Sequence, residues 1–251
     1  MIGAMRDWLF LLVAGVAAGV IGTAGGITSL VSYPALLAIG VPPLAANVTN
    51  SVALLGSGSG AVLRAGGDVD GHRDALREWM AITIVCSLGG AVLLVLTPAG
   101  VFDRIVPFLV ATGSLVLLCQ PLIASALSRR GAHLSRATVV CLGACIAVYN
   151  GYFGAGSGIL MLTLVLLSIE PVLHRANALK NVIIAGSDVL PAALFAALGT
   201  VVWHAVWPLC IGALAGGLIG PTVARRVPAQ IMRVLIAACG LALALWLLFN
   251  P

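Results

Sequence analysis

The sequence predicts an all-α integral membrane protein made of two inverted repeats, each a re-entrant broken-helix hairpin followed by three transmembrane helices. Three observations support this fold class: an extremely apolar composition, a succession of apolar segments, and a repeat between the two halves of the chain. Of the 251 residues, 61% are hydrophobic and 8% are charged, and the mean hydropathy is +1.15. A soluble domain carries roughly 25% charged residues because its surface faces water. The chain therefore requires lipid around it.

Apolar segments follow one another along the whole chain, so residues 1–251 are expected to form a single membrane domain. Because a span needs about 20 apolar residues, the length fits seven or eight segments. Two of the segments are long enough for a hairpin, and glycines interrupt both, at 22–26 and at 151–158. In chain order the segments cover 8–39, 43–63, 79–96, 101–127, 137–169, 176–198, 203–223 and 229–249.

The two halves, 8–127 and 137–249, repeat one another in three blocks. A shift of 132 residues pairs Gly19, Gly22, Gly26 and Ile27 with Gly151, Gly154, Gly158 and Ile159. A shift of 130 pairs Ala46, Asn47, Val52, Gly56 and Ser57 with Ala176, Asn177, Val182, Gly186 and Ser187. A shift of 127 pairs Gly89, Gly90 and Gly113 with Gly216, Gly217 and Gly240. The constant order of the blocks indicates an internal repeat.

The basic residues indicate how the repeats cross the membrane. If every segment crosses once, seven basic residues (6, 64, 73, 77, 129, 130, 136) lie on one side and six (104, 175, 180, 225, 226, 233) on the other. If each broken segment is a re-entrant hairpin, only Arg6 and Arg104 lie on one side of the membrane. The other eleven basic residues then lie on the opposite side (64, 73, 77, 129, 130, 136, 175, 180, 225, 226, 233). Basic residues concentrate in cytoplasmic loops, so the hairpin topology is preferred, with the basic loops cytoplasmic and both termini outside.

The lengths of the broken segments favour the same topology. The stretches on either side of the first break, 8–21 and 27–39, hold 14 and 13 residues. Each would span about 20 Å as an α-helix, which is too short for a hydrocarbon core of about 30 Å. Inverted repeats with discontinuous helices recur among transporters.

The two glycine breaks predict an anion site at mid-membrane. Unwound backbone survives there only where it lines a cavity or is buried in protein. The N–H groups that begin a helix lack partners and carry the positive end of its dipole, and two such ends attract an anion. The alternative is close helix packing alone, which is the interpretation adopted for Gly56-Gly60 and Gly212-Gly216-Gly220. The predicted binding residues at the breaks are Gly22, Thr23, Gly25, Gly26, Gly154, Gly156, Ser157 and Gly158.

A polar patch follows each break and supplies the remaining candidate residues. Polar side chains inside spans usually face a pathway or the interior of the bundle. Lys180 aligns with Asn50, so only the second half carries a basic side chain at this position. Alternatively, Lys180 lies near a helix end and extends its ammonium toward the membrane surface. The alternative for the asparagines is that they form hydrogen bonds between helices and do not bind the anion. Asp188 could relay protons, pair with Lys180 more than two turns away, or pair with a neighbouring helix. The patches contain Asn47, Asn50 and Ser51 in the first half and Asn177, Lys180 and Asn181 in the second.

No catalytic, metal or cofactor motif accompanies these residues, so the chain is not expected to be an enzyme and no cofactor is expected. The cysteines lie in apolar segments without zinc-site spacing, and no HExxH or GxSxG occurs. The basic residues are dispersed among loops rather than clustered, which argues against nucleic-acid binding. Glu170, His174 and His204 lie at segment ends, where solvated side chains are expected.

Several stretches resemble the sulfite exporter TauE/SafE family. The stretch AAGVIGTAGGITSLVSYPALLAIGVPPLAANVTNSVALL resembles its N-terminal repeat, and NGYFGAGSGILMLTLVLL, RANALKNVI and ALGTVVWHAVWPLCIGALAGGLIGPTVARRVP resemble its C-terminal repeat. The resemblance covers about residues 10–249 and implies a multi-pass permease of the bacterial cytoplasmic membrane for small sulfur-containing or organic anions. The first break, Gly-Thr-Ala-Gly-Gly, is poorer in glycine than the family pattern, so the two tips are expected to bind unequally.

The sequence thus predicts a secondary transporter for a small anion, with a sulfur oxyanion or organosulfonate implied by the resemblance, working by alternating access at a mid-membrane site. The expected partners are that anion, the lipid bilayer and a coupling ion, either a proton or sodium. A non-transporting membrane scaffold or assembly factor and a passive anion channel are the alternatives. Nothing in the sequence fixes the oligomeric state.

Overall fold

The computed structural model describes residues 2–129, 135–224 and 229–249, and it contains no β-strand within those ranges. The all-α prediction is therefore confirmed for the described chain. The α-helices are α1 (Ile2–Gly25), α2 (Ser29–Ala38), α3 (Pro43–Ala53), α4 (Leu55–Ala65), α5 (Arg73–Leu96), α6 (Ala99–Arg129), α7 (Arg136–Tyr152), α8 (Ser157–Ser168), α9 (Leu173–Leu198), α10 (Trp203–Ala224) and α11 (Ala229–Phe249), with a 3-10 turn, η1 (Gly66–Val69), between α4 and α5.

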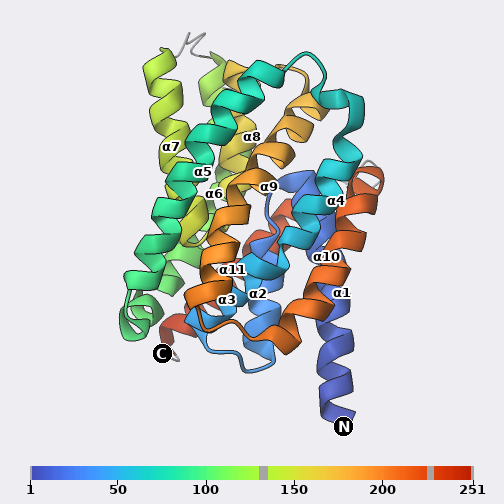
Figure 1. Ribbon diagram of the computed structural model, residues 1–251, viewed down its shortest axis with the longest axis vertical. Coiled ribbons are helices and arrows are strands. Elements are labelled where there is room, and N and C mark those ends of the chain that lie inside the picture. Colours follow the sequence, from blue (N-terminus) through green and yellow to red (C-terminus); the bar gives the residue numbers. More distant parts are fainter. Residues whose placement is uncertain (1, 130–134, 225–228, 250–251) are drawn as a thin grey trace.

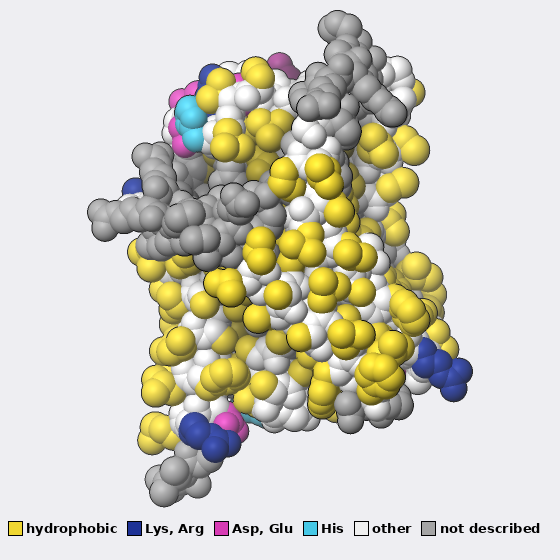
Figure 2. Space-filling model, turned by 180° about the vertical axis from the view of Figure 1, so that it is seen from behind, with side chains coloured by type: hydrophobic (Ala, Val, Ile, Leu, Met, Phe, Trp, Pro, Cys, Tyr) yellow, Lys and Arg dark blue, Asp and Glu magenta, His cyan; other side chains and the backbone are white. Residues whose placement is uncertain are grey.

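The helices are long and apolar enough for a multi-pass membrane protein. Five of them contain a stretch that qualifies as a span: Met5–Thr23, Arg73–Leu96, Ala99–Cys119, Leu173–Leu198 and Trp203–Gly220. Shorter apolar helices cover Ser29–Ala38, Ser157–Ser168 and Val234–Phe249. Figure 2 shows hydrophobic side chains over the middle of one face, with charged side chains near its two ends. Such an exposed apolar band suits contact with lipid rather than water.

Both broken segments turn back halfway through the molecule. In Figure 1, α1 rises from the N-terminus at the lower end and α2 returns toward that end, while α7 descends from the opposite end and α8 climbs back. The two arms of each hairpin pack against each other. The helices α2 and α8 have 10 and 12 residues, or about 15 and 18 Å, which is too short to cross a membrane.

The first break is shorter than predicted. A half-helix ending near residue 21 was expected, but α1 continues to Gly25, and only Gly26–Thr28 leave the helix. The last turn of α1 stays closed because the Gly26 N–H donates to the Gly22 carbonyl at 2.6 Å. Gly26 then reverses the chain with a φ of +71°, which a glycine adopts at little cost. Gly22, Thr23 and Gly25 are therefore helical.

The segment after the first hairpin is also divided, contrary to the single run predicted over 43–63. Leu54 separates α3 from α4, although its φ of −72° and ψ of −8° stay in the right-handed helical region. Its N–H donates to the Asn50 carbonyl at 2.9 Å, and its carbonyl accepts from the Gly58 N–H at 3.0 Å, so the two helices follow one another directly. The corresponding segment of the second half, α9, is continuous.

The helices of the two halves pack on one another in reciprocal pairs. α1 packs on α10 and α7 packs on α5, while α6 packs on α11 and α4 on α9. Glycines allow these close approaches: a side chain at Gly212 or Gly216 would collide with the backbone of α1, and one at Gly56 or Gly60 with the backbone of α10. The packing interpretation of these two glycine stripes is thus confirmed.

Both chain ends lie at the lower end of Figure 1, whereas the α4–α5 and α8–α9 connections lie at the upper end. Arg64, Arg73 and Arg175 flank those upper connections, and Arg136 begins α7 there. Arg130, Arg225 and Arg226, which the topology count also used, lie outside the described residues. The inversion of the repeats and the cytoplasmic placement of the basic loops stay predictions.

Candidate functional site

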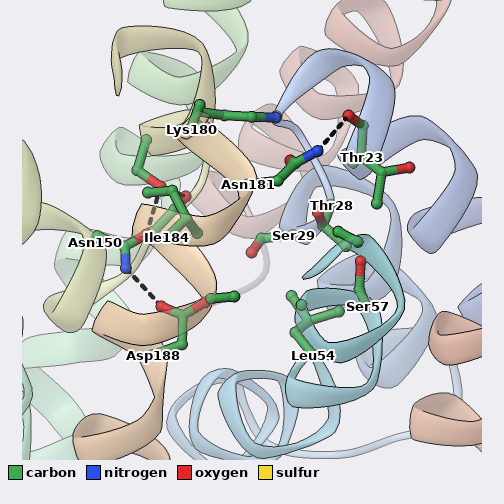
Figure 3. Close-up of a pocket in the computed structure, with 18 residues that line it drawn as sticks. Thr23, Thr28, Ser29, Leu54, Ser57, Asn150, Lys180, Asn181, Ile184 and Asp188 are labelled. Atoms are coloured by element: carbon green, nitrogen blue, oxygen red, sulfur yellow. Dashed lines mark hydrogen bonds between the residues drawn. The ribbon is translucent and has the colours of Figure 1, made fainter. Parts of the chain in front are cut away.

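A cavity of about 70 Å³ lies between the two breaks. Figure 3 shows side chains from α1, α2, α4, α7 and α9 directed into it. Its lining is mostly glycine, hydroxyl and amide groups, with one cation and one acid. The lining residues are Gly22, Thr23, Gly26, Thr28, Ser29, Leu54, Ser57, Gly58, Ala61, Asn150, Gly154, Ser157, Gly158, Lys180, Asn181, Ile184, Ala185 and Asp188.

The first turns of α2 and α8 both open onto this cavity. Gly26, Ser29, Ser157 and Gly158 line it, and α8 begins at Ser157 directly after Gly156, which has a φ of +81°. The positive ends of two helix dipoles therefore face the same small space. Most N–H groups of these first turns already donate to preceding carbonyls, as Ser157 does to Gly154 and Leu30 to Ile27, both at 3.1 Å. The N–H groups of Ser29 and Gly158 have no backbone acceptor among the described residues. This is the arrangement that attracts an anion.

Lys180 carries the positive charge of the cavity. The residue is 1% exposed, and its ammonium has no hydrogen bond or salt bridge within the described ranges. In Figure 3 it points toward the α1 side of the cavity, near Thr23. An ammonium that is removed from water without a counter-charge costs several kcal/mol. A bound anion would offset that cost.

Asp188 lies two helical turns farther along α9 and joins a hydrogen-bonded chain to the second break. Asn150 Nδ2 donates to Asp188 Oδ1 at 2.6 Å, and Ser157 Oγ donates to Asn150 Oδ1 at 2.5 Å. No salt bridge joins Asp188 to Lys180, so the two charges occupy separate ends of the site. Asp188 thus pairs with a neighbouring helix, as one of the predicted alternatives states, because it accepts a hydrogen bond from Asn150 of α7.

Asn150 is the main functional candidate that the sequence reasoning missed. It lies in the last turn of α7 and contacts α8 and α9 together through Ser157 and Asp188. Its signal was present, since it is an amide directly before the Gly151–Gly158 break in an otherwise apolar segment. Ser29, the first residue of α2, was missed as well; Asn50 Nδ2 donates to its Oγ at 3.3 Å.

Two of the predicted asparagines hold the hairpins in place instead of lining the cavity. Asn47 Nδ2 donates to the Tyr152 carbonyl at 3.0 Å, and Asn177 Nδ2 donates to the Thr23 carbonyl at 2.9 Å. Each carbonyl belongs to the last turn of a hairpin helix in the other half, where intrahelical donors are missing. Interhelical hydrogen bonding, the alternative given for the asparagines, is therefore observed here.

The other predicted residues divide between this cavity and a second one. Asn181 lines the first cavity and also donates to the Thr23 carbonyl, at 3.3 Å. Asn50 and Ser51 line a second cavity of about 40 Å³, which shares Asn150 and Asp188 with the first. Neither Gly25 nor Gly156 is among the lining residues. The structure thus brings together eleven of the predicted positions around two adjoining cavities: Gly22, Thr23, Gly26, Asn50, Ser51, Gly154, Ser157, Gly158, Lys180, Asn181 and Asp188.

The remaining ionisable residues lie away from these cavities. Glu170 is 5% exposed rather than solvated as expected, because His72 Nε2 and Arg175 Nη1 each approach its Oε2 at 3.4 Å. This cluster joins the α8–α9 connection to the α4–α5 connection at the upper end of the molecule. Among the described residues, no three His, Cys, Asp or Glu side chains are placed to hold a metal ion.

Comparisons with known proteins agree with the membrane fold. The family model described as sulfite exporter TauE/SafE matches residues 9–247. A probable membrane transporter protein of Sinorhizobium sp, ORF9, is 32% identical over 96% of this chain and 92% of its own length. The probable membrane transporter protein YfcA of Escherichia coli K12 is 27% identical over 93% of this chain and 86% of its own.

A probable membrane transporter protein of Haemophilus influenzae is 25% identical over 90% of this chain and 88% of its own length. No solved structure matches the chain. The family match spans nearly every helix described above, including both breaks and all of α9. The chain therefore belongs to the sulfite exporter TauE/SafE family of membrane transporters.

Proposed function

We propose that the chain is a secondary transporter that carries a small anion across a bacterial cytoplasmic membrane, with its basic loops in the cytoplasm. The anion binds between the tips of the two hairpins, and alternating access around that point moves it across. The observation that carries the proposal is the buried ammonium of Lys180, which has no partner among the described residues and shares a cavity with the starts of α2 and α8.

Electrostatics favour an anion over a cation or a neutral solute at this end of the site. The ammonium and the two helix N-termini all present positive charge, and Thr28, Ser57 and Asn181 supply polar groups around it. A cavity of about 70 Å³ exceeds the roughly 10–15 Å³ that one water needs. It therefore suits an oxyanion with a few atoms better than a large organic anion.

The class of anion rests on family membership. The description of the matching family names sulfite, and a sulfur oxyanion or a small organosulfonate offers the compact negative oxygens that backbone N–H groups bind. The relatives' names call them probable membrane transporters and specify no substrate. We therefore propose sulfite and related sulfur oxyanions first and short sulfonates second.

The contact between the hairpin tips favours a carrier over a passive channel. Gly26 and Gly158 meet backbone to backbone, so the two tips are in contact beside the cavity. A carrier opens such a contact on one side of the membrane at a time, and hairpins entering from opposite ends of the molecule (Figure 1) provide two moving parts for this. A channel would require a path that stays open, and a scaffold would require no buried charge.

Flux measurements on proteoliposomes test the proposal. The wild-type chain is expected to take up labelled sulfite or thiosulfate with saturable kinetics, and Lys180→Met to lose that uptake at least tenfold. Lys180→Met should also unfold at a higher temperature without substrate, because it removes an unpaired buried charge. Arg64→Met, which removes an exposed cation at the end of α4, serves as the matched control.

The alternatives give different results in the same assay. Flux that rises linearly with anion concentration would identify a channel. A failure to move sulfite, thiosulfate, taurine, sulfoacetate or simple carboxylates would favour the scaffold. Undiminished uptake by Lys180→Met would refute the assignment of the site.

A further inference from the structure

The second cavity differs chemically from the first, although the two adjoin. It measures about 40 Å³ and is lined by Ser29, Asn50, Ser51, Leu54, Asn150, Gly151, Phe153, Gly154, Asp188 and Pro191. Lys180, which makes the first cavity positive, and Gly158 in the first turn of α8 do not line it, although Ser29 at the start of α2 does. Its polar groups are a carboxylate, two amides and two hydroxyls, so oxygen atoms predominate.

One of these oxygens is buried without a partner. Asn50 is 1% exposed, and its Oδ1 accepts no hydrogen bond from the described residues, although its Nδ2 donates to Ser29 Oγ at 3.3 Å. An amide oxygen that is desolvated and left unsatisfied costs about 1–3 kcal/mol. A donor or a cation in the cavity would satisfy it.

The negative end of a helix also faces this cavity. α7 ends at Tyr152, and the N–H groups of Phe153 and Gly154 both donate to the Tyr149 carbonyl. The carbonyls of Asn150 and Gly151 thus lack a backbone N–H donor within the described chain. The last carbonyls of a helix carry partial negative charge, so this end of α7 favours a cation.

Asp188 supplies the full negative charge. Its Oδ1 accepts from Asn150 Nδ2 at 2.6 Å, and no basic side chain forms a salt bridge with it in the part of the chain that the structure describes. The other charged residue that lines either cavity is Lys180, which lines only the first. It lies eight positions earlier on α9, or about 12 Å of helical rise. No titratable side chain of α2, α3 or α7 lines the second cavity.

We propose that this second cavity is a sodium-binding site formed by Asp188, Asn50, Ser29, Ser51 and the carbonyl end of α7. A hard monovalent cation is bound by carboxylate, amide, hydroxyl and carbonyl oxygens, and ends of discontinuous helices coordinate sodium in other transporters. A proton on Asp188 would neutralise the carboxylate but would leave the Asn50 oxygen and the α7 carbonyls without a cation.

The inference rests on the proposed function, because it makes sodium the coupling ion for the anion in the adjoining cavity. Ser29, Asn150, Gly154 and Asp188 line both cavities, so the two ligands would share neighbours and attract each other. Sodium is then expected to tighten anion binding, and the anion must tighten sodium binding by the same factor.

Thermal unfolding of the full-length purified chain in nanodiscs tests the site without requiring transport. Sodium chloride is titrated against N-methylglucamine chloride at constant chloride, in the absence of any sulfur anion. The unfolding midpoint of the wild type is expected to rise by about 5 °C and then to level off, because sodium binds the folded chain and not the unfolded one. Asp188→Asn, which keeps an oxygen for Asn150, should need at least tenfold more sodium, and Asp74→Asn, an exposed acid at the start of α5, should behave as wild type.

Direct binding of radioactive sodium to the wild type gives a second readout that no variant's folding can confound. Binding of about one ion per chain, strengthened several-fold by sulfite, supports the site. Absence of saturable binding, or an equal sodium response in Asp188→Asn, overturns it. If sulfite flux is intact but follows a pH gradient and ignores sodium, the sodium site is wrong and the anion transporter stands. If sodium binds but no anion is transported, the sodium site stands and the anion transporter is wrong.

Discussion

Gly26 and Gly158 touch each other through their backbones. A methyl group placed on Gly26 would lie 2.5 Å from the carbonyl carbon of Gly158, and one placed on Gly158 would lie 2.6 Å from the Cα of Gly26. Contacts below 3.0 Å are closer than real side-chain carbons reach, so neither position has room for a side chain. Each glycine lies at the tip of one hairpin, and the contact is where the two halves of the transporter meet beside the cavity.

Replacing Gly158 by alanine is expected to separate these tips. Gly158 lies in the first turn of α8 and has no positive φ, so its backbone conformation accepts alanine. The expected loss of stability and flux therefore comes from the steric clash with Gly26. Overpacking costs roughly 1–3 kcal/mol, and anion flux should fall at least tenfold. Both quantities are measured in the same preparation, by thermal unfolding and by uptake into proteoliposomes.

Gly89→Ala is the matched control for this change. Gly89 also lies within a helix, α5, and nothing lies within 4 Å of a side chain built there. Alanine at an open helical position is expected to stabilise by about 0.5–1 kcal/mol and to leave flux unchanged. If Gly158→Ala transports as well as Gly89→Ala, the close contact of the tips has no part in transport.

The asparagines that hold the hairpins give an asymmetric prediction. The Tyr152 carbonyl accepts from Asn47 alone, whereas the Thr23 carbonyl accepts from Asn177 and Asn181. Leaving a buried carbonyl unsatisfied costs about 1–3 kcal/mol, so Asn47→Ala should lower the unfolding midpoint more than Asn177→Ala does.

The double variant Asn177→Ala with Asn181→Ala tests the same reasoning. It removes both donors to the Thr23 carbonyl, so its loss of stability should exceed the sum of the two single losses. Additive losses, measured by thermal unfolding of all three variants, would mean that these asparagines contribute through packing rather than through the shared carbonyl.

Glycine pattern was sufficient to predict the two breaks, and charge singled out Lys180 as a candidate, whose role stays a prediction. The glycines at 154, 156 and 158 interrupt an apolar segment that is too long for one span, and Lys180 is a cation inside an apolar segment, in a cluster with Asn177 and Asn181. The pattern could not separate a glycine needed for its φ from one needed for contact. Gly22 is helical, and a side chain on it would collide with Thr28, so the prediction that it belongs to the break is wrong.

Features that depend on which helices meet could not be predicted from local pattern. Asn150 matters because α7 packs on α9 near Asp188, and nothing in the sequence around it specifies that neighbour. The division of the second segment at Leu54 has no glycine or proline at the break itself. Both α3 and α4 pack against α9 and α10, and a single sequence does not reveal these neighbours.

Pro191 and Ser87 give a prediction about the stability of α9. Proline has no N–H, so the Ser187 carbonyl four residues earlier loses its helical donor. Ser87 Oγ of α5 donates to that carbonyl at 2.6 Å instead. Ser87→Ala should therefore destabilise by about 1–2 kcal/mol.

The cost of Ser87→Ala should shrink when Pro191→Ala is also present, because alanine restores an N–H to that carbonyl. A double-mutant cycle measured by unfolding checks this coupling. Equal costs of Ser87→Ala in both backgrounds would show that the hydroxyl does not serve as a replacement donor for the freed carbonyl.

Labelling of two single cysteines distinguishes the hairpin topology from eight simple crossings. Asp70 lies in the α4–α5 connection and Thr200 in the α9–α10 connection, and both residues are exposed. Two re-entrant hairpins place them on opposite sides of the membrane, as the two ends of Figure 1 indicate, whereas eight crossings place both on the side of the N-terminus. In intact cells a membrane-impermeant maleimide is expected to label Thr200→Cys directly and Asp70→Cys only after permeabilisation, because the basic connections are cytoplasmic. The wild-type chain, whose six cysteines lie within helices, supplies the background, and labelling of both positions from the same side would exclude the inverted hairpins.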